Sequence, residues 1–349
     1  MPGKTMKAVY LDAPRRLRMT EEPIPQVTDP HEALIRVGSV GVCGSDCHFY
    51  DRGRIGRFVV TEPIILGHEC AGTIVEVGSA VEGLAAGDRV AVEPGYPCRR
   101  CRRCREGRYN LCEHEVTFMA TPGSADGAFR EYLTWPADFL YPLPEELSLE
   151  DGAMIEPLAV GVHACRRGGV EPGLSAAVLG AGPIGLLAAQ AAGAYGARPV
   201  VITDVVGSRV EFARKLELEA VNAAETDPVE AIRERTRGGA DVVIETAGTA
   251  ATLRQAMAAV RTGGVVVPVG MLPHDEAELP VMDMIGREYD LRPVFRYANC
   301  YRPALSLVEA GKIRLAPLRT HEFPLEKVEA AIRTAIEQKA EAIKVMVRV

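Results

Sequence analysis

The chain has few aromatic residues, little lysine and no long apolar run, and the last of these shortages is the informative one. Aromatic residues make up 5% of its 349 residues, with a single tryptophan, and lysine is scarce after residue 7. No apolar run reaches the roughly 18 to 20 residues that cross a bilayer, and the N-terminus lacks a secretory apolar core. We therefore expect a cytoplasmic globular protein.

Composition and charge narrow the class of protein further. The formal net charge of -7 argues against nucleic acid as a global partner. At 47% hydrophobic composition the chain can bury sizeable cores, and its length suggests two domains. Its nine cysteines are an odd number in a large chain without a secretory signal, which does not fit a disulfide framework. Metal binding accounts for them better.

The first candidate metal ligands lie between Gly41 and Gly78. Cys43 stands in a glycine-rich turn, and a proline-containing loop separates it from His68 and Glu69. A thiolate, an imidazole and a carboxylate oxygen form a mixed ligand set that Zn²⁺ accepts. Because three protein ligands leave one position open for water or substrate, this pattern predicts a catalytic rather than a structural zinc site.

Short apolar segments surround this motif and indicate a β-rich domain. Residues 6–40, 72–78 and 87–92 alternate apolar runs with Pro- and Gly-containing turns, which is typical of short strands in an antiparallel, barrel-like domain. A last strand at 343–347 is expected to return to this domain. The residues between them would then form a second domain, inserted between the two parts of the first.

A second cysteine cluster has the spacing of a structural zinc site. Cys98, Cys101, Cys104 and Cys112 are separated by two, two and seven residues in a stretch with almost no apolar side chains. Four thiolates at such spacing suit a closed tetrahedral site, and the alternative is a set of free surface cysteines.

The same segment is rich in arginine, which leaves a second interpretation open. A zinc ribbon that binds nucleic acid is one possibility, and a solvated surface or subunit contact is the other. No aromatic residues interleave with the arginines, which disfavours nucleic acid. The arginines are at positions 99, 100, 102, 103, 105 and 108.

Glu156 opens a predicted helix that continues to Arg167, with Pro157 at its first position. A carboxylate at this end of a helix is stabilised by the helix dipole and needs no other role. It could equally lie in or near the inner shell of the metal. The spacing alone favours neither interpretation.

A strand, turn and helix from Ala176 onward predict a dinucleotide site. The strand 176–179 leads through a glycine motif into an Ala/Leu-rich helix, and a second strand, 200–203, ends at Asp204. The helix amides would bind the pyrophosphate. Asp204 would accept hydrogen bonds from the ribose hydroxyls and would repel a 2′-phosphate, which favours NAD over NADP. Alternatively, Asp204 is only a turn acid at a strand end. Strands at 241–245 and 265–269 alternate with helices and support a doubly wound parallel sheet.

Together these motifs resemble the zinc-dependent medium-chain dehydrogenases across essentially the full chain, and most of all their sorbitol dehydrogenase branch. The segments that carry the closer resemblance are 53–56, 118–122, 155–158 and 295–297. The resemblance implies an α/β protein with a GroES-like, β-rich catalytic domain and a doubly wound Rossmann domain. The implied boundaries are residues 1–158 for the catalytic domain with its structural zinc lobe at 94–114, residues 159–297 for the NAD-binding domain, and residues 298–349 for the return to the catalytic domain.

The resemblance also implies roles for individual residues. Cys43, His68 and Glu69 would hold the catalytic zinc, Glu156 would bind it directly or through a water, and Ser45 would pass the proton. NAD would contact Gly180, Gly182, Pro183, Ile184, Gly185, Asp204 and Arg209, and the polyol would contact Ile55, Phe118, Glu156, Arg296 and Tyr297. A second zinc would occupy the four cysteines Cys98, Cys101, Cys104 and Cys112.

Two features depart from the pattern of that branch: the four-cysteine lobe, which its animal members generally lack, and Phe49, which stands where a tyrosine is usual. The missing hydroxyl would lie near the substrate and bears on which polyol is bound. Cys47 and Cys70 are expected to be packing residues because small thiols are commonly buried. His48 is expected to be a surface or packing residue, although it lies near the metal turn.

The function implied is the reversible, NAD-dependent and zinc-dependent oxidation of a secondary alcohol of a polyol, of the sorbitol or xylitol class, to a ketose. The expected assembly is a homo-oligomer, a homotetramer or a dimer. A same-fold alternative is a dehydrogenase for threonine, glucose or a simple alcohol. An alternative of a different class is a zinc-dependent nucleic-acid-binding module built on the arginine-rich lobe.

Overall fold

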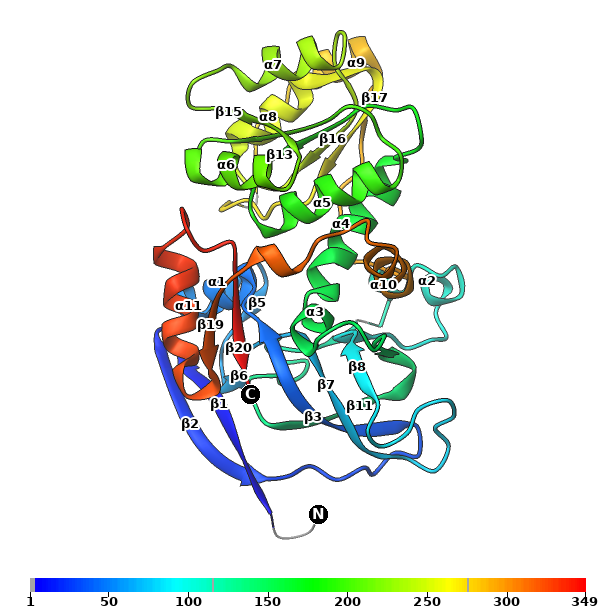
Figure 1. The fold of residues 1–349 in the computed structure, drawn as a ribbon, viewed down its shortest axis with the longest axis vertical. Helices are drawn as coiled ribbons and strands as arrows, with labels where there is room; N and C mark the ends of the chain where they lie inside the picture. The colour runs from blue at the N-terminus through cyan, green and yellow to red at the C-terminus, as the bar shows by residue number, and fades with distance from the viewer. Residues whose placement is uncertain (1–3, 115, 275) are drawn as a thin grey trace. The chain divides into compact units, whose positions relative to one another are not determined.

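The structure, a computed structural model, describes residues 4–114, 116–274 and 276–349. Residues 1–3, at the start of the predicted first domain, lie outside this range. The chain forms two compact units, Met1–Glu156 with Leu315–Val349, and Pro157–Arg314 (Figure 1). No helix in the described ranges is both long and apolar enough to cross a bilayer.

A mainly antiparallel sheet of seven strands organises the first unit within the described residues. Its order is β12 (Leu140–Pro142), β8 (Arg89–Val92), β7 (Glu69–Val77), β3 (Glu32–Gly41), β20 (Lys344–Arg348) and β19 (Arg319–Pro324), with β11 (Tyr132–Pro136) pairing on β3. The predicted return of the last strand is confirmed, because Val347 of β20 pairs with Val40 of β3. Figure 1 shows this red C-terminal strand beside the blue β3.

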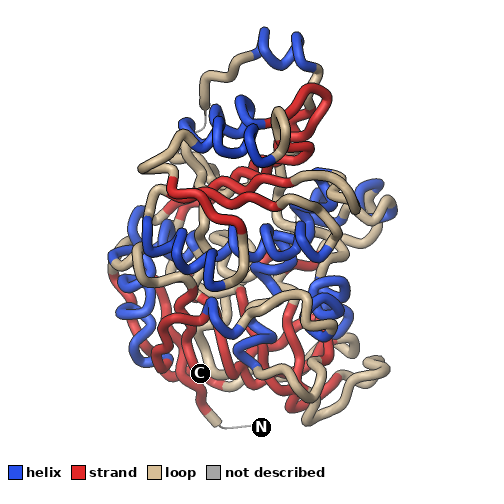
Figure 2. The backbone as a smooth tube through the Cα atoms, turned by 45° about the horizontal axis from the view of Figure 1, so that its top comes forward, coloured by secondary structure: helices blue, strands red, loops and turns tan. Residues whose placement is uncertain are grey.

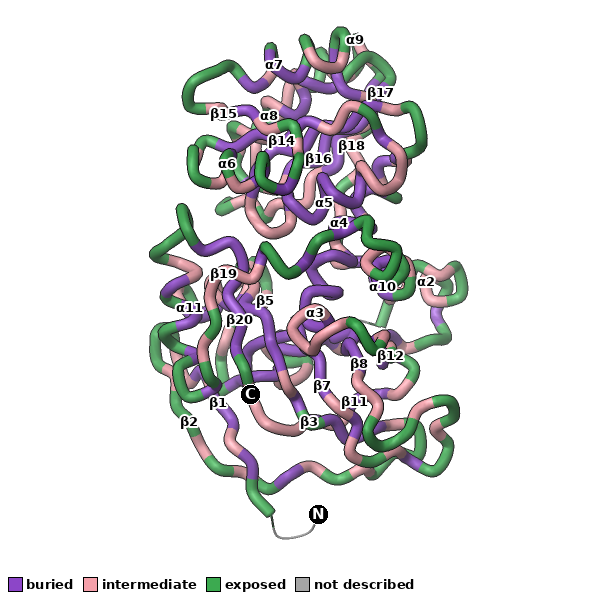
Figure 3. Tube along the Cα trace, viewed as in Figure 1, coloured by how far each residue is buried: buried purple, intermediate pink, exposed green. Residues whose placement is uncertain are grey.

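Smaller sheets and short helices complete the first unit. One sheet has three strands, in the order β2 (Arg16–Pro23), β1 (Thr5–Ala13) and β6 (Ile64–Ile65). Two further sheets have two strands each: β4 (Arg54–Ile55) pairs with β5 (Phe58–Val59), and β9 (Gly95–Tyr96) pairs with β10 (Thr117–Phe118). The helices are α1 (Gly44–Arg52), α2 (Arg102–Arg105), α3 (Leu149–Ala153) and α11 (Val328–Glu337), with the 3₁₀ turns Tyr109–Leu111, Ala137–Phe139, Ala316–Leu318 and Leu325–Lys327. Most apolar residues of β1 and β3 are buried and contribute to the core of this unit, and Figure 3 colours buried residues purple.

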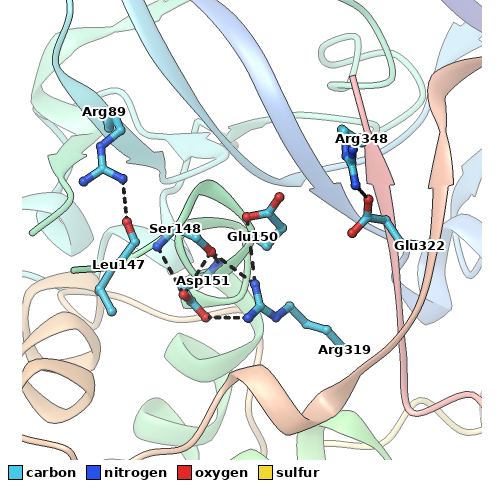
Figure 4. Close-up of polar contacts among 8 residues, drawn as sticks. All are labelled: Arg89, Leu147, Ser148, Glu150, Asp151, Arg319, Glu322 and Arg348. Carbon is cyan, nitrogen blue, oxygen red and sulfur yellow. Dashed lines mark hydrogen bonds and ion pairs between the residues drawn. The ribbon is translucent and has the colours of Figure 1, made fainter. Parts of the chain in front are cut away.

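Arg319 joins the returning segment to the start of α3. Its guanidinium donates to Ser148 Oγ at 3.1 Å and lies 3.5 Å from Asp151 (Figure 4). Ser148 and Asp151 also satisfy each other's backbone amides in a capping box, which fixes the first turn of α3. Residues far apart in sequence therefore share one polar cluster on this side of the unit.

The second unit is the predicted doubly wound parallel sheet. Its described strand order is β15 (Glu219–Asn222), β14 (Val200–Asp204), β13 (Ala176–Leu179), β16 (Ala240–Glu245), β17 (Val260–Pro268) and β18 (Asp290–Leu291). The helices are α4 (Ile155–Gly168), whose first two residues belong to the first unit, α5 (Pro183–Ala194), α6 (Gly207–Lys215), α7 (Pro228–Arg235), α8 (Ala250–Ala259), α9 (Val281–Arg287) and α10 (Tyr301–Glu309). Helices lie on both faces of this sheet (Figure 2), so strands such as β13 are buried along their whole length.

The boundary of the second unit lies later than the sequence indicates. Residues 298–314, assigned above to the returning segment, belong to the second unit, and the return begins at Leu315. The contacts of Cys300 account for this, because its sulfur lies 3.9 Å from His163 Nδ1 and accepts from Arg166 Nη1 at 3.8 Å, both on α4.

Candidate active site

The turn at Cys43 is held by the first turn of α1. Cys43 is the N-cap residue, and its backbone amide donates to the Asp46 carboxylate at 2.9 Å. The other oxygen of Asp46 accepts from Gly67 N at 3.0 Å. Asp46 is fully buried and thus ties the segment of the thiol ligand to the segment of the imidazole ligand.

His68 and Glu69 are placed at the start of β7 by a glycine. Gly67 has a φ of +84°, where L side chains are strained, and a Cβ there would lie 3.1 Å from the Phe129 ring. Glu69 then pairs with Gly41 in the ladder between β3 and β7. One ligand atom from each of Cys43, His68 and Glu69 lies within 4.8 Å of the others, so the structure brings together the three predicted metal ligands.

The charges around these three residues fit a cation. Burial lowers the pKa of His68, but the Cys43 thiolate, Asp46 and Glu156 outweigh burial and raise this pKa to about 10. The group therefore stabilises positive charge at its centre. The donor set of one sulfur, one nitrogen and one oxygen suits Zn²⁺ and leaves a fourth position open.

Glu156 lies close to this group without joining it. It is buried in the first turn of α4, where its negative charge acts on His68. Among the described residues, the set of mutually close ligand atoms contains Cys43, His68 and Glu69 but not Glu156. The helix-dipole interpretation and a role near the metal are thus compatible for this carboxylate.

Two of the predicted substrate residues lie in the same unit as the metal ligands. Phe118 is on the short β9–β10 ribbon, and its ring centroid is 5.5 Å from that of His68. Ile55, on β4, packs against the hydrophobic core. Arg296 and Tyr297 belong to the second unit, where the Tyr297 ring is buried 5.8 Å from the Tyr301 ring.

The glycine turn after β13 has the shape of a phosphate site. Gly180 has a φ of +101°, and Gly185 allows α5 to pack because a Cβ there would overlap the Gly180 carbonyl oxygen. At Gly182, the N-cap of α5, a Cβ would have, among the described residues, the Arg209 guanidinium as its one neighbour within 4 Å, at 3.9 Å. Pro183 and Ile184 form the first turn of α5, whose amides lack intrahelical acceptors. The turn thus has room and donors for a pyrophosphate.

Asp204 ends β14 and faces this turn. Its two carboxylate oxygens accept from Ala181 N at 2.7 Å and from Val206 N at 2.8 Å, and Arg209 Nη1 lies 3.8 Å away. These bonds fit the turn-acid interpretation, and they also hold a negative charge at the strand end where a ribose would bind.

The four cysteines of the predicted structural site converge. Cys101 Sγ lies 3.3 Å from Cys104 Sγ and 3.9 Å from Cys112 Sγ, and Cys98 Sγ lies 3.9 Å from Cys104 Sγ. The backbone amide of Glu113 lowers the pKa of Cys101 to about 6, which favours the thiolate that binds metal. The cluster has the ligands of a closed Cys₄ zinc site.

Several arginines of this lobe pair with nearby acids. Arg99 lies 2.8 Å from Asp138, and Arg102 and Arg103 both bond to Glu106. These exposed pairs agree with the interpretation of the arginines as a solvated surface.

Glu93 is a buried carboxylate that sequence reasoning missed. It accepts from Tyr109 of the lobe at 2.6 Å and from Tyr141 of β12 at 2.9 Å. Burial raises its pKa to about 7, although both hydroxyls oppose the shift. Glu93 therefore links the four-cysteine lobe to the main sheet of its unit.

Replacing Glu93 with glutamine is expected to remove a pH dependence of stability. In the folded protein the pKa of Glu93 is about 7, above its ordinary value of 4.5. Protonation of Glu93 therefore stabilises the folded protein fully below pH 4.5, and this stabilisation is lost as pH rises through 7. The parent should lose on the order of 2 to 3 kcal/mol from this group between pH 5 and pH 8. Urea unfolding of Glu93→Gln at both pH values should show this loss abolished, and an exposed control, Glu82→Gln, should behave like the parent.

The thiols and the imidazole that flank the ligands lie as expected for packing residues. Cys70 is buried in the core, Cys47 packs against it, and burial raises the pKa of both thiols to about 12. His48, on α1, is half-buried, and burial lowers its pKa. Neither thiol belongs to a described group of mutually close metal ligands.

Two further residues at the site were not predicted. Asp46 and Lys344 are both buried and both contact ligand segments, Asp46 through Cys43 N and Lys344 through an ion pair with Glu69. The position of Asp46 at the third residue of a helix was a signal for a capping role. No sequence signal pointed to Lys344, which is distant from the ligands along the chain.

Two family models of known proteins match this chain, one in each half. Residues 29–145 match the family model of the alcohol dehydrogenase GroES-like domain, and residues 183–310 match that of the zinc-binding dehydrogenases. The chain is 43% identical to a sorbitol dehydrogenase of Bacillus subtilis (strain 168), covering 99% of this chain and 97% of the relative.

Two other relatives extend this likeness. A probable D-xylulose reductase A of Aspergillus terreus is 41% identical, with 91% of each chain covered. The solved structure of a zinc-binding dehydrogenase from Sinorhizobium meliloti 1021, with NADP bound, superposes with a TM-score of 0.90 at 33% identity over 99% of this chain and 100% of the other. With its Cys43–His68–Glu69 group and its glycine turn, the chain belongs to the zinc-dependent medium-chain dehydrogenases, in the branch of the sorbitol dehydrogenases.

Proposed function

We propose that the protein catalyses the reversible oxidation of a secondary alcohol of a polyol, of the sorbitol or xylitol class, to a ketose. The observation that carries the proposal is the convergence of Cys43, His68 and Glu69 within 4.8 Å, with a fourth position left open. Sorbitol dehydrogenase and D-xylulose reductase relatives that cover almost the full chain support the substrate class.

The proposed catalytic site assigns one task to each residue. Cys43, His68 and Glu69 would hold a catalytic zinc, and Glu156 would act on it through a water, because its carboxylate lies outside the ligand group. When bound, zinc supplies Lewis acidity to the alcohol oxygen and the nicotinamide accepts hydride. Ser45, two residues after Cys43 and half-buried in the first turn of α1, would accept the alcohol proton and pass it on.

The proposed substrate residues have different support. Phe118 packs against His68 and would place an apolar wall beside the alcohol carbon, and Ile55 would add to this wall. Arg296 and Tyr297 are proposed from the family resemblance. The second zinc is proposed at Cys98, Cys101, Cys104 and Cys112, which makes two zinc ions per chain.

NAD is the proposed cofactor, held at Gly180, Gly182, Pro183, Ile184 and Gly185, with Arg209 beside the adenine. Asp204→Asn should relax the preference for NAD, because the amide keeps an acceptor for Ala181 N but removes the charge that repels a 2′-phosphate. Like-charge contact costs several kcal/mol, so the ratio of kcat/KM for NADP to that for NAD should rise roughly 100-fold. Steady-state rates with both cofactors measure this ratio. The exposed control Glu225→Ala should leave it unchanged, and an unchanged ratio in Asp204→Asn would contradict the assignment.

A cytoplasmic homo-oligomer, a tetramer or dimer, is the proposed assembly. The nine cysteines among the described residues form no disulfide, which suits a reducing compartment. Val281, Met282 and Ile285 of α9 are 56%, 77% and 63% exposed, and apolar side chains gathered on one helix suit a subunit contact. The proposed partner is a small polyol, with neither nucleic acid nor membrane involved.

A substrate panel tests the proposal. NAD reduction would be measured with sorbitol, xylitol, threonine, glucose and ethanol, together with zinc content per chain. Turnover on sorbitol or xylitol with two zinc ions supports the proposal. Turnover confined to threonine, glucose or ethanol would replace the polyol assignment with another substrate of the same fold.

A further inference from the structure

Lys344 is a buried lysine that contacts a proposed metal ligand. It is 3% exposed, its ammonium forms an ion pair with Glu69 Oε2, and it donates to the Val42 carbonyl oxygen at 2.9 Å. Lysine is almost never fully buried unless it is paired, so the burial of Lys344 indicates a charged partner. The partner is the ligand carboxylate, and the second contact lies one residue before Cys43.

Three strands position this pair. Glu69 on β7 lies opposite Gly41 on β3, and Met346 on β20 lies opposite Gly41 on the other side. A Cβ at position 41 would overlap the Glu69 carboxylate and would lie 2.9 Å from Lys344 Cε. Glycine at position 41 therefore leaves the space in which carboxylate and ammonium meet across β3.

The ion pair involves one of the two carboxylate oxygens of Glu69 and not the other. Oε2 is buried, and within the described part of the chain its only polar partner is the Lys344 ammonium. We propose that Lys344 is a positioning residue for the zinc site: it holds Oε2 and leaves Oε1 of Glu69 for the metal. This inference rests on the proposed zinc site. It goes further by stating why Glu69 binds through one oxygen only.

The consequence concerns the open position of the metal. A carboxylate can bind a metal through one or both oxygens, and the second oxygen would fill the place that the substrate oxygen needs. The ammonium also offsets part of the negative charge of a site that contains Cys43, Glu69 and Glu156. Lys344 thus keeps the site both open and electrophilic.

Cobalt spectroscopy of the holoenzyme tests this role without relying on turnover. The metal is replaced by Co²⁺, and the difference spectrum between the parent and Cys43→Ser isolates the proposed catalytic site. Lys344→Met should let Glu69 bind through both oxygens, so the visible absorption should weaken and shift as the coordination number rises. Lys344→Arg keeps the cation and should keep the parent spectrum. Lys7→Met removes an exposed Lys–Glu pair of the same unit and should also leave the spectrum unchanged.

The outcomes separate this inference from the proposed function. A parent protein without Cys43-dependent cobalt absorption would remove the metal site itself. A parent spectrum that Lys344→Met leaves unchanged would overturn the positioning role alone. If Lys344→Met does not fold, a crystal structure of the zinc-loaded parent decides the question: zinc on Oε1 with Lys344 on Oε2 supports the role, and zinc bound to both oxygens overturns it.

Discussion

Cys43→Ala is expected to remove the catalytic metal and with it polyol turnover. Metal content should fall from two ions per chain to one, because one of the two ligand groups loses its only sulfur. Loss of a residue that merely supports a ligand typically costs roughly 10- to 100-fold in metal affinity or activity, and loss of the ligand itself should exceed this. Metal analysis after gel filtration and the initial rate of NAD reduction with sorbitol measure the two effects.

Cys47→Ala provides the matched control for this prediction. Its thiol lies four residues further along the same segment but packs against the core and belongs to no described ligand group. This variant should keep both metal ions and the parent rate, with a loss of roughly 1 to 2 kcal/mol in unfolding free energy from the small cavity. If Cys43→Ala retained two metal ions and turned over sorbitol like the parent, Cys43 would not be a ligand.

The convergence of the metal ligands could be predicted from residue types, because few side chains bind zinc. A thiol in a glycine turn, followed along the chain by adjacent imidazole and carboxylate groups, supplies three of the side-chain types that zinc accepts. The left-handed conformation of Gly67, beside His68, shows why the second motif also needs its glycine. The nucleotide turn was predictable for a similar reason, because Gly180 and Gly185 are each required by backbone geometry.

The supporting residues could not be predicted, since their roles depend on strand pairing between distant segments. Lys344 reaches Glu69 only because β20 pairs with β3, which pairs with β7. Glu93 acquires its two tyrosine donors only when the lobe folds against β8 and β12. In sequence, Lys344 is a charged residue within the predicted strand 343–347, and Glu93 is the charged residue that follows the predicted strand 87–92.

The domain boundary at Leu315 had no local signal either. The sequence of α10 (Tyr301–Glu309) would suit a helix of either unit, and only its packing decides between them. Cys300, just before α10, contacts His163 and Arg166 on α4, which keeps that helix in the second unit. Sequence patterns therefore located the elements, whereas tertiary contacts determined the unit to which each belongs.

Removing one cysteine of the four-cysteine lobe is expected to unfold that lobe while leaving the catalytic metal in place. Between Cys98 and Cys112 the lobe contains a four-residue helix and one 3₁₀ turn, whose buried residue is Asn110, so this segment has little apolar core of its own. Structural zinc contributes an apparent binding free energy of roughly 10 to 16 kcal/mol in zinc-finger peptides, which is enough to hold such a segment folded. Cys104→Ser should therefore lose one metal ion per chain and expose the lobe to proteases.

Limited trypsin digestion measures this unfolding directly, because the lobe is rich in arginine, the residue after which trypsin cleaves. Cys104→Ser should be cut within 98–112 much faster than the parent, and the cobalt absorption that depends on Cys43 should persist. Cys165→Ala, a buried thiol on α4 outside both ligand groups, should keep two metal ions and the parent resistance. Parent metal content and parent resistance in Cys104→Ser would show that packing around Glu93 and Tyr109, rather than a metal, holds the lobe.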